Sequence, residues 1–333
     1  MAHGYAAQNP GEDLQIIEYD LGPLGPTEVD IAVEYCGICQ SDIGMIDNTW
    51  GVSSYPIVPG HEVIGIVRAC GDQVSQLNPG QRVGVGWNAG SCMHCEWCNT
   101  GEHNLCASVQ GTIVGRHGGF ADQIRAAATW TFPIPSGLRP EVAGPLLCGG
   151  ITVFNPIVQY DIQPGDRVGV IGIGGLGHLA LQFLQALGCE VTAFSSSPEK
   201  EDEARKLGAD HFFTSIDTGA LSSLHSSLDF ILSTVDVSLD WETYLHILCP
   251  KGRLHLVGSL TDPMTIPVGA MLLGQKSISA SPDGSPATVI QMLEFAECHN
   301  IEPIVEIFPL TDVNEALERV RHGKPRYRVV LRQ

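Results

Sequence analysis

The cysteines of this chain fall into two groups by spacing. The sequence holds 11 of them in 333 residues, and four lie within one short segment: Cys92, Cys95, Cys98 and Cys106. Four thiolates complete the tetrahedral shell of a zinc ion and leave no open position, so this set predicts a structural zinc site. An iron–sulfur cluster also uses four cysteines and stays an alternative on spacing alone.

The other cysteines have no comparable spacing. Cys39 and Cys148 lie on either side of the four-cysteine segment, at a distance along the chain. The rest are interpreted as ordinary buried thiols, because a free cysteine behaves as a small hydrophobic residue. These are Cys36, Cys70, Cys189, Cys249 and Cys298. Residues 1–14 show no basic stretch followed by an apolar one, so we expect neither a secretory signal nor a disulfide framework.

A glycine-rich loop is the second feature that could do chemistry. Residues Gly172–Gly177 have the pattern G-x-G-x-x-G, between an apolar strand pattern and a helical pattern. The first glycine permits a tight turn, the second lets the backbone approach a pyrophosphate, and the third lets helix pack on sheet. The helix N-terminus adds N–H groups and partial positive charge. The loop therefore predicts a dinucleotide site, formed by Gly172, Gly174, Gly175, Leu176 and Gly177.

The end of the next strand indicates which dinucleotide binds. A fold that selects NAD usually has Asp or Glu there, which accepts hydrogen bonds from the ribose hydroxyls. This chain has Ser195, Ser196 and Ser197 instead, and Lys200 three residues later. Hydroxyl and ammonium groups can donate to a phosphate, and no carboxylate at the strand end repels it. The segment favours NADP(H), with an ordinary polar loop as the alternative.

The secondary structure expected to position these residues changes near residue 150, from short strands to alternating strands and helices. Before it, short β-rich runs alternate with turn residues and predict an irregular antiparallel domain. The expected strands are Glu28–Tyr35, Glu62–Cys70, Arg82–Trp87 and Phe120–Ala126. After about residue 165 strands and helices alternate, which predicts a doubly wound parallel sheet in an α/β fold. Its expected strands are Arg167–Ile173, Glu190–Phe194, Leu228–Ser233, Arg253–Gly258 and Ser277–Ala280.

The helices follow from apolar periodicity and from their end signals. We expect Gly175–Leu187 to end at Gly188, and Pro198–Leu207 to end at Gly208. A third helix is expected at Trp241–Leu248. From residue 286 onward the pattern predicts a helix, a strand, a helix and a final strand. Their expected ranges are Thr288–His299, Glu302–Phe308, Val313–His322 and Tyr327–Leu331.

Composition and charge exclude several classes of protein. Hydrophobic residues make up 44% and charged residues 17%, which excludes a disordered chain. A formal net charge of −19 argues against nucleic-acid or anionic-membrane partners, because phosphate binding needs positive faces. The six basic residues among the last 15 lie in a regular helix-turn-strand pattern, so a folded terminus is favoured over a nucleic-acid tail. The longest apolar stretch, Val168–Leu184, is interrupted by five glycines, His178 and Gln182, so no membrane span is expected.

Taken together, the motifs resemble those of zinc-dependent medium-chain alcohol dehydrogenases. They occur in that family's order along essentially the whole chain: Tyr35–Asp42, Pro59–Glu62, the four-cysteine segment, Leu147–Thr152 and Gly172–Gly177. Ser195–Lys200 and Arg326–Arg328 narrow the resemblance to the cinnamyl alcohol dehydrogenase-like branch, and within it to bacterial NADPH-dependent aldehyde reductases. The resemblance implies a GroES-like β-rich catalytic domain, residues 1–149 and 286–333, with a Rossmann domain, residues 150–285, inserted.

The resemblance also implies a set of site residues. Cys39, His61 and Cys148 match the ligands of a catalytic zinc, and Glu62 matches a carboxylate that can join the metal when water or substrate exchanges. Ser41 matches the hydroxyl that passes a proton between the substrate oxygen and the cofactor ribose. Thr152 matches a residue on the nicotinamide side; Val257 and Arg328 match further cofactor contacts, the arginine to phosphate. Trp50, Val52 and Trp87 are substrate-pocket candidates, with ordinary packing as the alternative.

The chain departs from the family pattern at three places. Gln40 and Gly44 stand where many relatives have histidine, and glycine cannot carry a proton at the outer end of a relay. Residues 107–115 contain no aromatic side chain, although cinnamyl alcohol dehydrogenases proper have a tryptophan shortly after the fourth structural cysteine. Bulky lignin aldehydes are therefore not expected as native substrates.

These observations predict a cytoplasmic, homodimeric enzyme with two zinc ions per chain that reduces aldehydes to primary alcohols with NADPH. Zinc polarises the carbonyl oxygen, and the nicotinamide supplies the hydride. An NAD-dependent polyol or secondary alcohol dehydrogenase is the alternative within enzymes, and the serines at the strand end count against it. A non-catalytic scaffold stabilised by zinc is the alternative outside enzymes.

Overall fold

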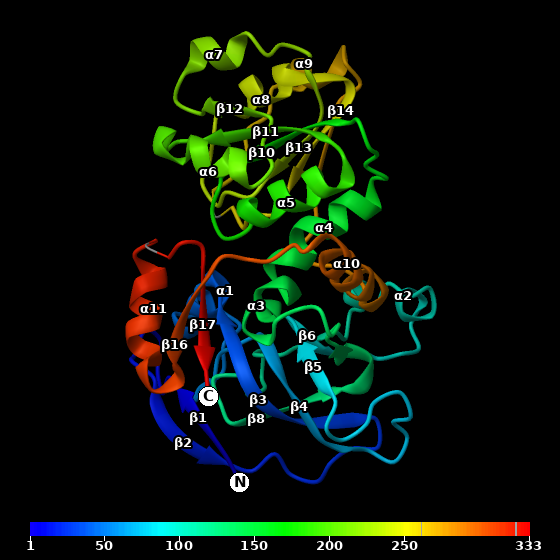
Figure 1. Ribbon diagram of the computed structural model, residues 1–333, viewed down its shortest axis with the longest axis vertical. Helices are drawn as coiled ribbons and strands as arrows, with labels where there is room; N and C mark the ends of the chain where they lie inside the picture. Colours follow the sequence, from blue (N-terminus) through cyan, green and yellow to red (C-terminus); the bar gives the residue numbers. More distant parts are fainter. Residues whose placement is uncertain (261, 324) are drawn as a thin grey trace. The chain divides into compact units, whose positions relative to one another are not determined.

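The structure is a computed structural model that describes residues 1–260, 262–323 and 325–333. The chain forms two compact units, the first made of residues 1–151 and 284–333 and the second of residues 152–283 (Figure 1). The division falls two residues from the expected boundaries at 149/150 and 285/286. The first unit is therefore assembled from both ends of the chain, and the second is a continuous insertion.

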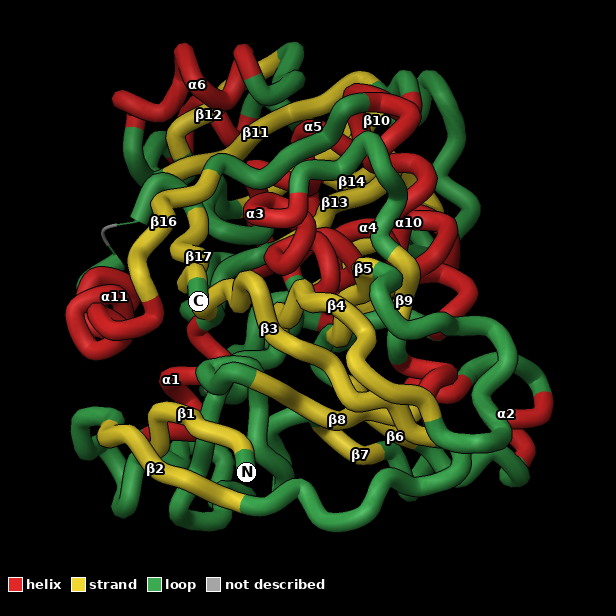
Figure 2. The backbone as a smooth tube through the Cα atoms, turned by 60° about the horizontal axis from the view of Figure 1, so that its bottom comes forward, coloured by secondary structure: helices red, strands yellow, loops and turns green. Residues whose placement is uncertain are grey.

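The first unit is built on a seven-stranded sheet with the strand order β16-β17-β3-β4-β5-β9, in which β8 also pairs with β3. Burial alternates along β3, where Val29, Ile31 and Val33 face the core. The strands are β3 (Glu28–Ile38), β4 (Glu62–Cys70), β5 (Arg82–Val85), β8 (Gln123–Ala127), β9 (Phe132–Pro133), β16 (Val305–Pro309) and β17 (Arg328–Arg332). Two small pairs flank it: β1 (Ala2–Ala6) with β2 (Gln15–Tyr19), and β6 (Asn88–Gly90) with β7 (Gln110–Gly111) (Figure 2).

The helices of this unit range from single turns to a helix of 14 residues. They are α1 (Gln40–Ile46), α2 (Glu96–Asn99), α3 (Pro140–Ala143), α10 (Pro286–His299) and α11 (Val313–Arg321). Helix α11 packs its buried residues Val313, Ala316 and Leu317 into the same core as β3 and β17. Helix α10 begins at Pro286, two residues before the expected start, because the Ser285 hydroxyl accepts a hydrogen bond from the Thr288 N–H.

The second unit contains the parallel six-stranded sheet that the sequence predicts. Its order is β12-β11-β10-β13-β14-β15, the arrangement of a dinucleotide-binding Rossmann fold. The strands are β10 (Arg167–Ile171), β11 (Glu190–Ser195), β12 (His211–Thr214), β13 (Leu228–Ser233), β14 (Leu248–Leu256) and β15 (Ser277–Ala280). The strand order reverses between β10 and β13, and ligands bind such sheets at the carboxyl ends beside this point.

This unit contains the helices α5 (Gly177–Leu187), α6 (Glu201–Lys206), α7 (Thr218–Ser222), α8 (Trp241–Ile247) and α9 (Val268–Leu272). Three of them, α5, α6 and α8, lie where the sequence predicts helix, whereas α7 and α9 were not predicted. Gly188 has a φ of 94°, a left-handed conformation that ends α5 at minimal steric cost. The expected helix Pro198–Leu207 is divided, because its first turn is a 3₁₀ turn and α6 begins only at Glu201.

Residues 140–159 form helices that the sequence analysis does not predict. A 3₁₀ turn, Gly144–Leu147, follows α3, and α4 (Gly149–Gln159) begins with two glycines and contains Pro156. Glycine and proline have low helix propensity, so the local sequence does not predict a helix in this segment. Among the described residues no single helix has the length and apolar character to cross a membrane. The bent pair Pro140–Leu147 and Gly149–Gln159, with an angle of 54°, meets that criterion only when its parts are joined.

Three other expectations are corrected by the structure. The strand expected at Phe120–Ala126 begins only at Gln123, because residues 118–120 donate their N–H groups to carbonyls of residues 58–60. The strand expected from Glu302 begins at Val305, since Pro303 has no N–H to donate. Cys298 is exposed, because it lies outside the buried stripe of α10. Of the other single cysteines, Cys36 and Cys189 are buried, whereas Cys70 and Cys249 are only partly so.

Candidate active site and metal centres

Four candidate ligands from distant parts of the chain meet in the first unit. One ligand atom each from Cys39, His61, Glu62 and Cys148 lies within 4.8 Å of every other. The Cys39 and Cys148 sulfurs are 3.8 Å apart, and His61 Nε2 lies 3.3 Å from the Cys148 sulfur. Two sulfurs bound to one tetrahedral zinc at about 2.3 Å lie about 3.8 Å apart, so the donor set fits zinc.

The sheet brings these residues together. Strands β3 and β4 pair antiparallel, and Gly37 is the partner of Glu62. The end of β3 therefore lies beside the start of β4, which places Cys39 near His61. The 3₁₀ turn before Cys148 approaches β4 closely: a β-carbon on Gly144 would lie 2.6 Å from the Glu62 carbonyl oxygen. Because Gly144 has no β-carbon, the turn can approach β4 closely, and this places Cys148 near the other candidate ligands.

Asp42 is a candidate positioning residue that the sequence analysis missed. Its fully buried carboxylate accepts hydrogen bonds from His61 Nδ1 at 2.9 Å, the Gly60 N–H at 2.8 Å and the Cys39 N–H at 2.9 Å. A proton held on Nδ1 leaves the Nε2 lone pair for a metal. The signal that could have found Asp42 is its spacing from Cys39, because an acidic residue at the third position of a helix commonly bonds back to the N-cap N–H.

Glu62 has a partner that the sequence did not reveal. Its carboxylate forms an ion pair with the guanidinium of Arg328, and both side chains are buried. Burial raises the pKa of Glu62, while the Arg328 charge acts in the opposite direction. The second carboxylate oxygen, Oε2, has no protein partner among the described residues. The cofactor-phosphate role expected for Arg328 stays a prediction, and its side chain is committed to Glu62 in this structure.

The expected pocket residues differ in what they contact. The Trp87 ring stands edge-on to the His61 ring, with centroids 5.0 Å apart, and Trp50 stands edge-on to Trp87 at 6.1 Å. Val52 is exposed. A β-carbon on Gly44 would lie 3.5 Å from the Trp50 ring, so a larger side chain at position 44 would compete with Trp50 for space. Ser41 lies on α1 between the candidate ligand Cys39 and Asp42 and is partly exposed.

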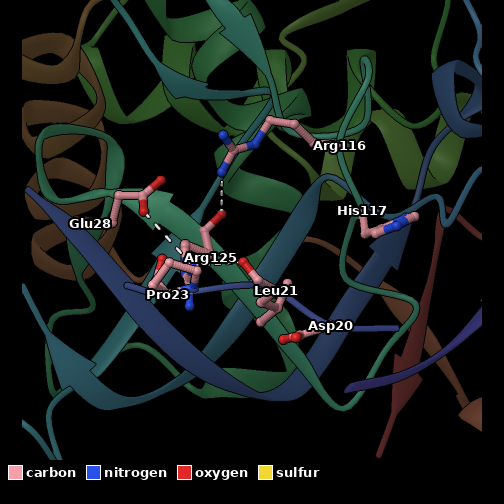
Figure 3. Close-up of a pocket in the computed structure, with 7 residues that line it drawn as sticks. All are labelled: Asp20, Leu21, Pro23, Glu28, Arg116, His117 and Arg125. Atoms are coloured by element: carbon pink, nitrogen blue, oxygen red, sulfur yellow. Dashed lines mark hydrogen bonds and ion pairs between the residues drawn. The ribbon is translucent and has the colours of Figure 1, made fainter. Parts of the chain in front are cut away.

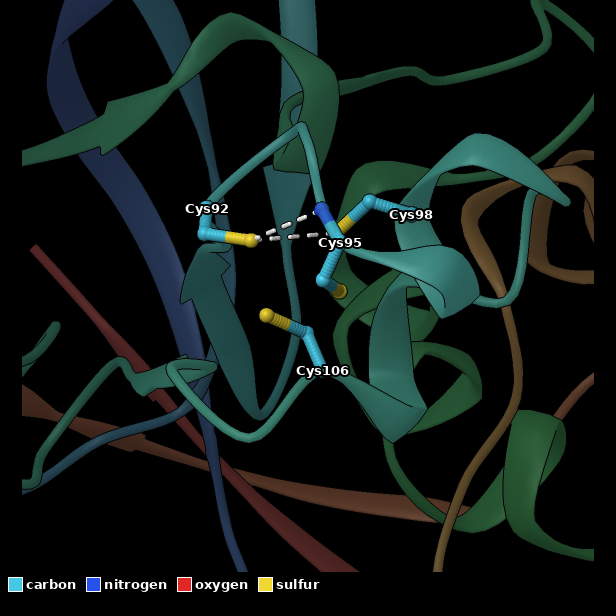
Figure 4. Close-up of side chains that lie close together, drawn as sticks. All are labelled: Cys92, Cys95, Cys98 and Cys106. Carbon is cyan, nitrogen blue, oxygen red and sulfur yellow. Dashed lines mark hydrogen bonds between the residues drawn. The ribbon is translucent and has the colours of Figure 1, made fainter.

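The four clustered cysteines form a second centre. Their four sulfur atoms all lie within 4.8 Å of one another, and they belong to Cys92, Cys95, Cys98 and Cys106 (Figure 4). The Cys92 and Cys98 sulfurs are 3.9 Å apart, which again fits a tetrahedral zinc. Hydrogen bonds from the backbone N–H groups of His94 and Cys95 lower the pKa of the Cys92 thiol to about 6. Four thiol groups fill the centre and leave no ligand position for a substrate.

The glycine-rich loop of the second unit has the geometry that its pattern predicts. Gly172 has a φ of 88°, and Thr234 donates a hydrogen bond to its carbonyl. A β-carbon on Gly177 would collide with that same carbonyl, so helix α5 can approach the loop only with glycine there. Beyond its chain neighbours, no heavy atom of the described residues lies within 4 Å of the β-carbon position of Gly174, which leaves this backbone open to a ligand.

The strand end beside this loop carries the remaining cofactor candidates. The Ser195 hydroxyl is buried and accepts a hydrogen bond from the Ser197 N–H, whereas Ser196 is exposed. Lys200 donates from Nζ to the Ile173 carbonyl at 2.8 Å, so the lysine reaches the glycine-rich loop. Val257 directly follows β14, at the carboxyl end of the sheet.

Thr152 is placed by a single contact. Its hydroxyl donates to the Pro282 carbonyl at 3.0 Å, and its side chain is buried in the second unit. The nicotinamide contact expected for this residue stays a prediction.

Comparison with known proteins decides the family. The alcohol dehydrogenase GroES-like domain matches residues 25–136, and the zinc-binding dehydrogenase domain matches residues 175–297. Aldehyde reductase AdhA of Synechocystis sp. is 50% identical over 331 residues, which cover 99% of this chain and 98% of that protein. The chain belongs to the zinc-dependent alcohol dehydrogenase family. It is therefore an oxidoreductase of alcohols and aldehydes.

Solved structures place this alcohol dehydrogenase in the cinnamyl alcohol dehydrogenase-like branch. The cinnamyl alcohol dehydrogenase SbCAD4 of Sorghum bicolor matches with a TM-score of 0.95 and 37% identity, over 99% of this chain and 97% of that chain. The cinnamyl alcohol dehydrogenase of Helicobacter pylori, solved with NADP(H), matches with a TM-score of 0.91 and 30% identity, over the same shares. The family, the branch and the two-part α/β fold predicted from the sequence are confirmed.

The role of Asp42 can be tested by removing its charge. We expect Asp42→Asn to weaken zinc retention in the alcohol dehydrogenase by about 10–100-fold, because a ligand histidine depends on the carboxylate that orients it. Competition with a chelator, followed by metal analysis, measures this. Asp47→Asn is the matched control, since Asp47 ends the same helix and pairs with Arg321 at the surface. Equal zinc retention in both variants would contradict the assignment.

Proposed function

We propose that this alcohol dehydrogenase reduces aldehydes to primary alcohols with NADPH as the hydride donor. The observation that carries the proposal is the end of β11, where Ser195 replaces an acidic residue and Lys200 reaches the glycine-rich loop. The 2′-phosphate of NADP(H) is a dianion, so an ammonium and hydroxyl donors suit it, whereas a carboxylate would repel it. NADP(H) in the Helicobacter pylori relative supports the same choice.

The residues of the first unit support carbonyl chemistry. A zinc ion held by Cys39, His61 and Cys148 would supply Lewis acidity, which polarises a carbonyl oxygen and lowers the pKa of an alcohol. Asp42 fixes the orientation and tautomer of His61. Ser41 is proposed to donate the proton that converts the reduced carbonyl to the alcohol, as a hydroxyl next to the ligand segment can.

A second zinc ion is proposed at the four-cysteine centre, with a structural role. Its four sulfurs belong to residues 92–106, so the metal would connect both ends of one irregular loop. Only two short helical turns, α2 and His103–Leu105, lie within this loop. A metal that closes such a loop contributes directly to folding free energy.

The pocket candidates favour aldehydes of moderate size. Trp87 stands next to the proposed zinc ligand His61, and Trp50 stands against Trp87, so the two indole rings form an aromatic wall. Residues 107–115 add no aromatic side chain of the lignin type. We propose aliphatic aldehydes of medium length and simple aromatic aldehydes as substrates, since apolar and flat groups pack well against indole rings.

A homodimer is proposed through the edge of the second unit. Among the described residues strand β15 pairs with β14 alone, so its other edge can pair with a second copy. Helix α9 and the residue after it expose Val268, Leu272 and Leu273, and Leu273 is 96% exposed. An edge strand beside an apolar patch suits a two-fold contact in which each copy uses the same surface.

Two zinc ions per chain are expected by metal analysis of the purified enzyme. Cys39→Ala should lose one zinc and the activity while the fold survives, because the four-cysteine centre stays intact. Cys95→Ala should mainly lower the thermal midpoint, because a structural metal contributes folding energy. Cys298→Ala is the control, since that thiol is exposed and belongs to neither centre. One zinc or none in a fully active enzyme would overturn the two-zinc proposal.

Cofactor preference should depend on the strand end. We expect wild type to prefer NADPH and Ser195→Asp to improve the relative use of NADH, because a carboxylate repels the phosphate. Lys200→Ala should lower kcat/KM for NADPH about tenfold or more, since a charge-assisted hydrogen bond is worth about 1.5–3 kcal/mol. Lys206→Ala, an exposed lysine on the same segment, is the control. Equal efficiencies with both cofactors, or faster polyol oxidation with NAD, would contradict the proposal.

Ser41→Ala should lower turnover at least about tenfold with zinc still bound, because general acid catalysis is typically worth about 10²–10⁴-fold. Ser41→Thr retains a hydroxyl and should recover part of the rate. Steady-state kinetics between about pH 6 and 9, with metal analysis of each variant, measure the effect across the neutral range. A Ser41→Ala enzyme with wild-type turnover would exclude this proton path.

Sedimentation analysis tests the dimer. We expect Leu273→Asp to shift the enzyme toward monomer, because a carboxylate buried at a two-fold contact meets its own copy. Ile16→Asp is the control, as Ile16 is an exposed apolar residue of the first unit. A monomeric wild type, or a Leu273→Asp variant that sediments as wild type does, would reject this surface.

A further inference from the structure

A polar depression on the surface of the first unit shows one use of a largely buried polar side chain. Arg125 lines this depression (Figure 3). Its five guanidinium N–H groups all donate, two to the Asp30 carboxylate and three to the carbonyls of residues 21–23. Asp30 also balances the charge, so Arg125 holds its own connection in place and has no donor left for a ligand. The second unit has a buried polar side chain of similar kind, His255, but its partners lie at the ligand-binding edge of a sheet.

His255 joins two strands through both nitrogens of its ring. It lies on β14 and is fully buried. Nδ1 lies 2.9 Å from the hydroxyl oxygen of Ser279, and Nε2 lies 3.0 Å from that of Ser281. Ser279 on β15 is the register partner of His255, and Ser281 follows after two residues, the period at which side chains return to one face of a sheet. The ring therefore connects β14 to β15 and to the connection that follows β15.

The surroundings of His255 are largely aromatic. The ring of Tyr160, directly after α4, lies 5.3 Å from the imidazole between centroids, and the ring of Phe230 on β13 lies 6.1 Å away. Burial and the nearby charge of Arg253 lower the pKa of His255 to about 4, so the ring is neutral at pH 7. A neutral imidazole has one N–H donor and one acceptor nitrogen. One serine hydroxyl must therefore donate to the ring, and the other must accept from it.

Asn155 on α4 sets the direction of these hydrogen bonds. Its amide donates to the hydroxyl oxygen of Ser281 at 3.4 Å, which leaves the proton of that hydroxyl for Nε2 of His255. Nδ1 then carries the ring proton and donates to Ser279. The chain of bonds runs from α4 through the connection and β14 to β15. A polar network in which every member has a partner fixes one arrangement of the surrounding core.

The connection that this network holds lies between two residues predicted to contact the cofactor. The N–H of Ser281 donates to the carbonyl of Leu256, and Val257 is the next residue along the chain. The carbonyl of Pro282 accepts the hydrogen bond from Thr152. Pro282 is exposed and Val257 is partly exposed, so a ligand can reach this part of the sheet edge.

The sheet divides a bound dinucleotide into two halves. The pyrophosphate belongs at the glycine-rich loop after β10, and the end of β11 carries the groups for the adenosine ribose. The other half must then extend past the reversal of strand order, over the carboxyl ends of β13 and β14. The partners of His255 lie on β13, on β15 and beside α4. His255 is therefore placed to affect the nicotinamide half and not the adenosine half.

We propose that His255 is a positioning residue for the nicotinamide half of the cofactor, acting through Ser281 and the connection at residues 281–282. A buried polar group has a desolvation cost that an apolar side chain in the same space would avoid. Its hydrogen bonds give in return a fixed position for the backbone beside Val257 and Thr152. The inference rests on the proposed function in its use of a nicotinamide cofactor, but not on the preference for NADPH over NADH.

Calorimetric titration of the zinc-loaded enzyme with two probes tests the proposal. The probes are NADPH and adenosine 2′,5′-bisphosphate, which is the adenosine half of the same cofactor. His255→Phe keeps a planar ring and removes both hydrogen bonds. We expect this variant to bind NADPH about tenfold more weakly than wild type, a usual size for coupling within one network, and to bind the bisphosphate with unchanged affinity. Unchanged NADPH affinity, or an equal loss for both probes, would overturn the proposal.

Further variants separate hydrogen bonding from packing. His255→Gln retains a donor and an acceptor and should recover most of the NADPH affinity. Phe230→Leu is the matched control, because it disturbs the packing around the imidazole and removes no hydrogen bond. A loss of NADPH affinity in Phe230→Leu as large as in His255→Phe would reduce His255 to a packing role. If His255→Phe fails to fold, Ser281→Ala should show the same selective loss, and wild-type binding of NADPH by that variant would refute the network.

The positioning role and the proposed function fail by different results. A wild type that binds NADH more tightly than NADPH contradicts the NADPH preference alone. His255 is then tested in the same way with NADH and adenosine 5′-monophosphate as the two probes. In either case, a loss confined to the probe that carries nicotinamide supports the positioning role, and a loss shared by both probes contradicts it.

Discussion

The hydrogen bonds accepted by the buried carboxylate of Asp42 are the constraint on which the candidate metal centre of Cys39, His61 and Cys148 depends. The Asp42 carboxylate accepts hydrogen bonds from the imidazole of His61 and from the backbone N–H groups of Gly60 and Cys39. A buried charge is tolerated only when such donors surround it. The same bonds that compensate Asp42 therefore lock the end of β3 to the segment before β4. The donor set is organised by the protein itself, and a metal meets ligands that are already oriented.

The sequence predicted the elements whose own residues decide their structure. Strands β4, β13 and β15 have their expected ends, because apolar runs and turn residues mark them locally. The sequence could not show that residues 118–120 bond to residues 58–60, since that contact joins segments far apart in the chain. Helix α4 escaped prediction for a related reason: packing in the structure overrides the poor helix propensity of Gly149, Gly150 and Pro156.

The same division applies to the candidate site. Ligand types and family motifs indicated both donor sets, but spacing alone did not select Cys39, His61 and Cys148. The sequence could not predict ion pairs between residues on distant strands. Arg328 lies on β17 and Glu62 on β4, and the two side chains meet only because the sheet brings these strands close together. Position 44 is similar. In the sequence, Gly44 lacks the proton-carrying group that many relatives have there. In the structure, a β-carbon at this position would lie 3.5 Å from the Trp50 ring, which the sequence could not show.

The split of the first unit has a consequence for synthesis on the ribosome. The second unit is one continuous segment, so all six of its parallel strands have been made when residue 283 is added. The sheet of the first unit still lacks β16 (Val305–Pro309) and β17 (Arg328–Arg332), and β17 is the strand that pairs with β3. Because domains fold as units during elongation, the nucleotide-binding part can fold first. The early pair of strands β3 and β4, beside the candidate ligands Cys39 and His61, gains its pairing with β17 through β3 only after residues 328–332 have been made.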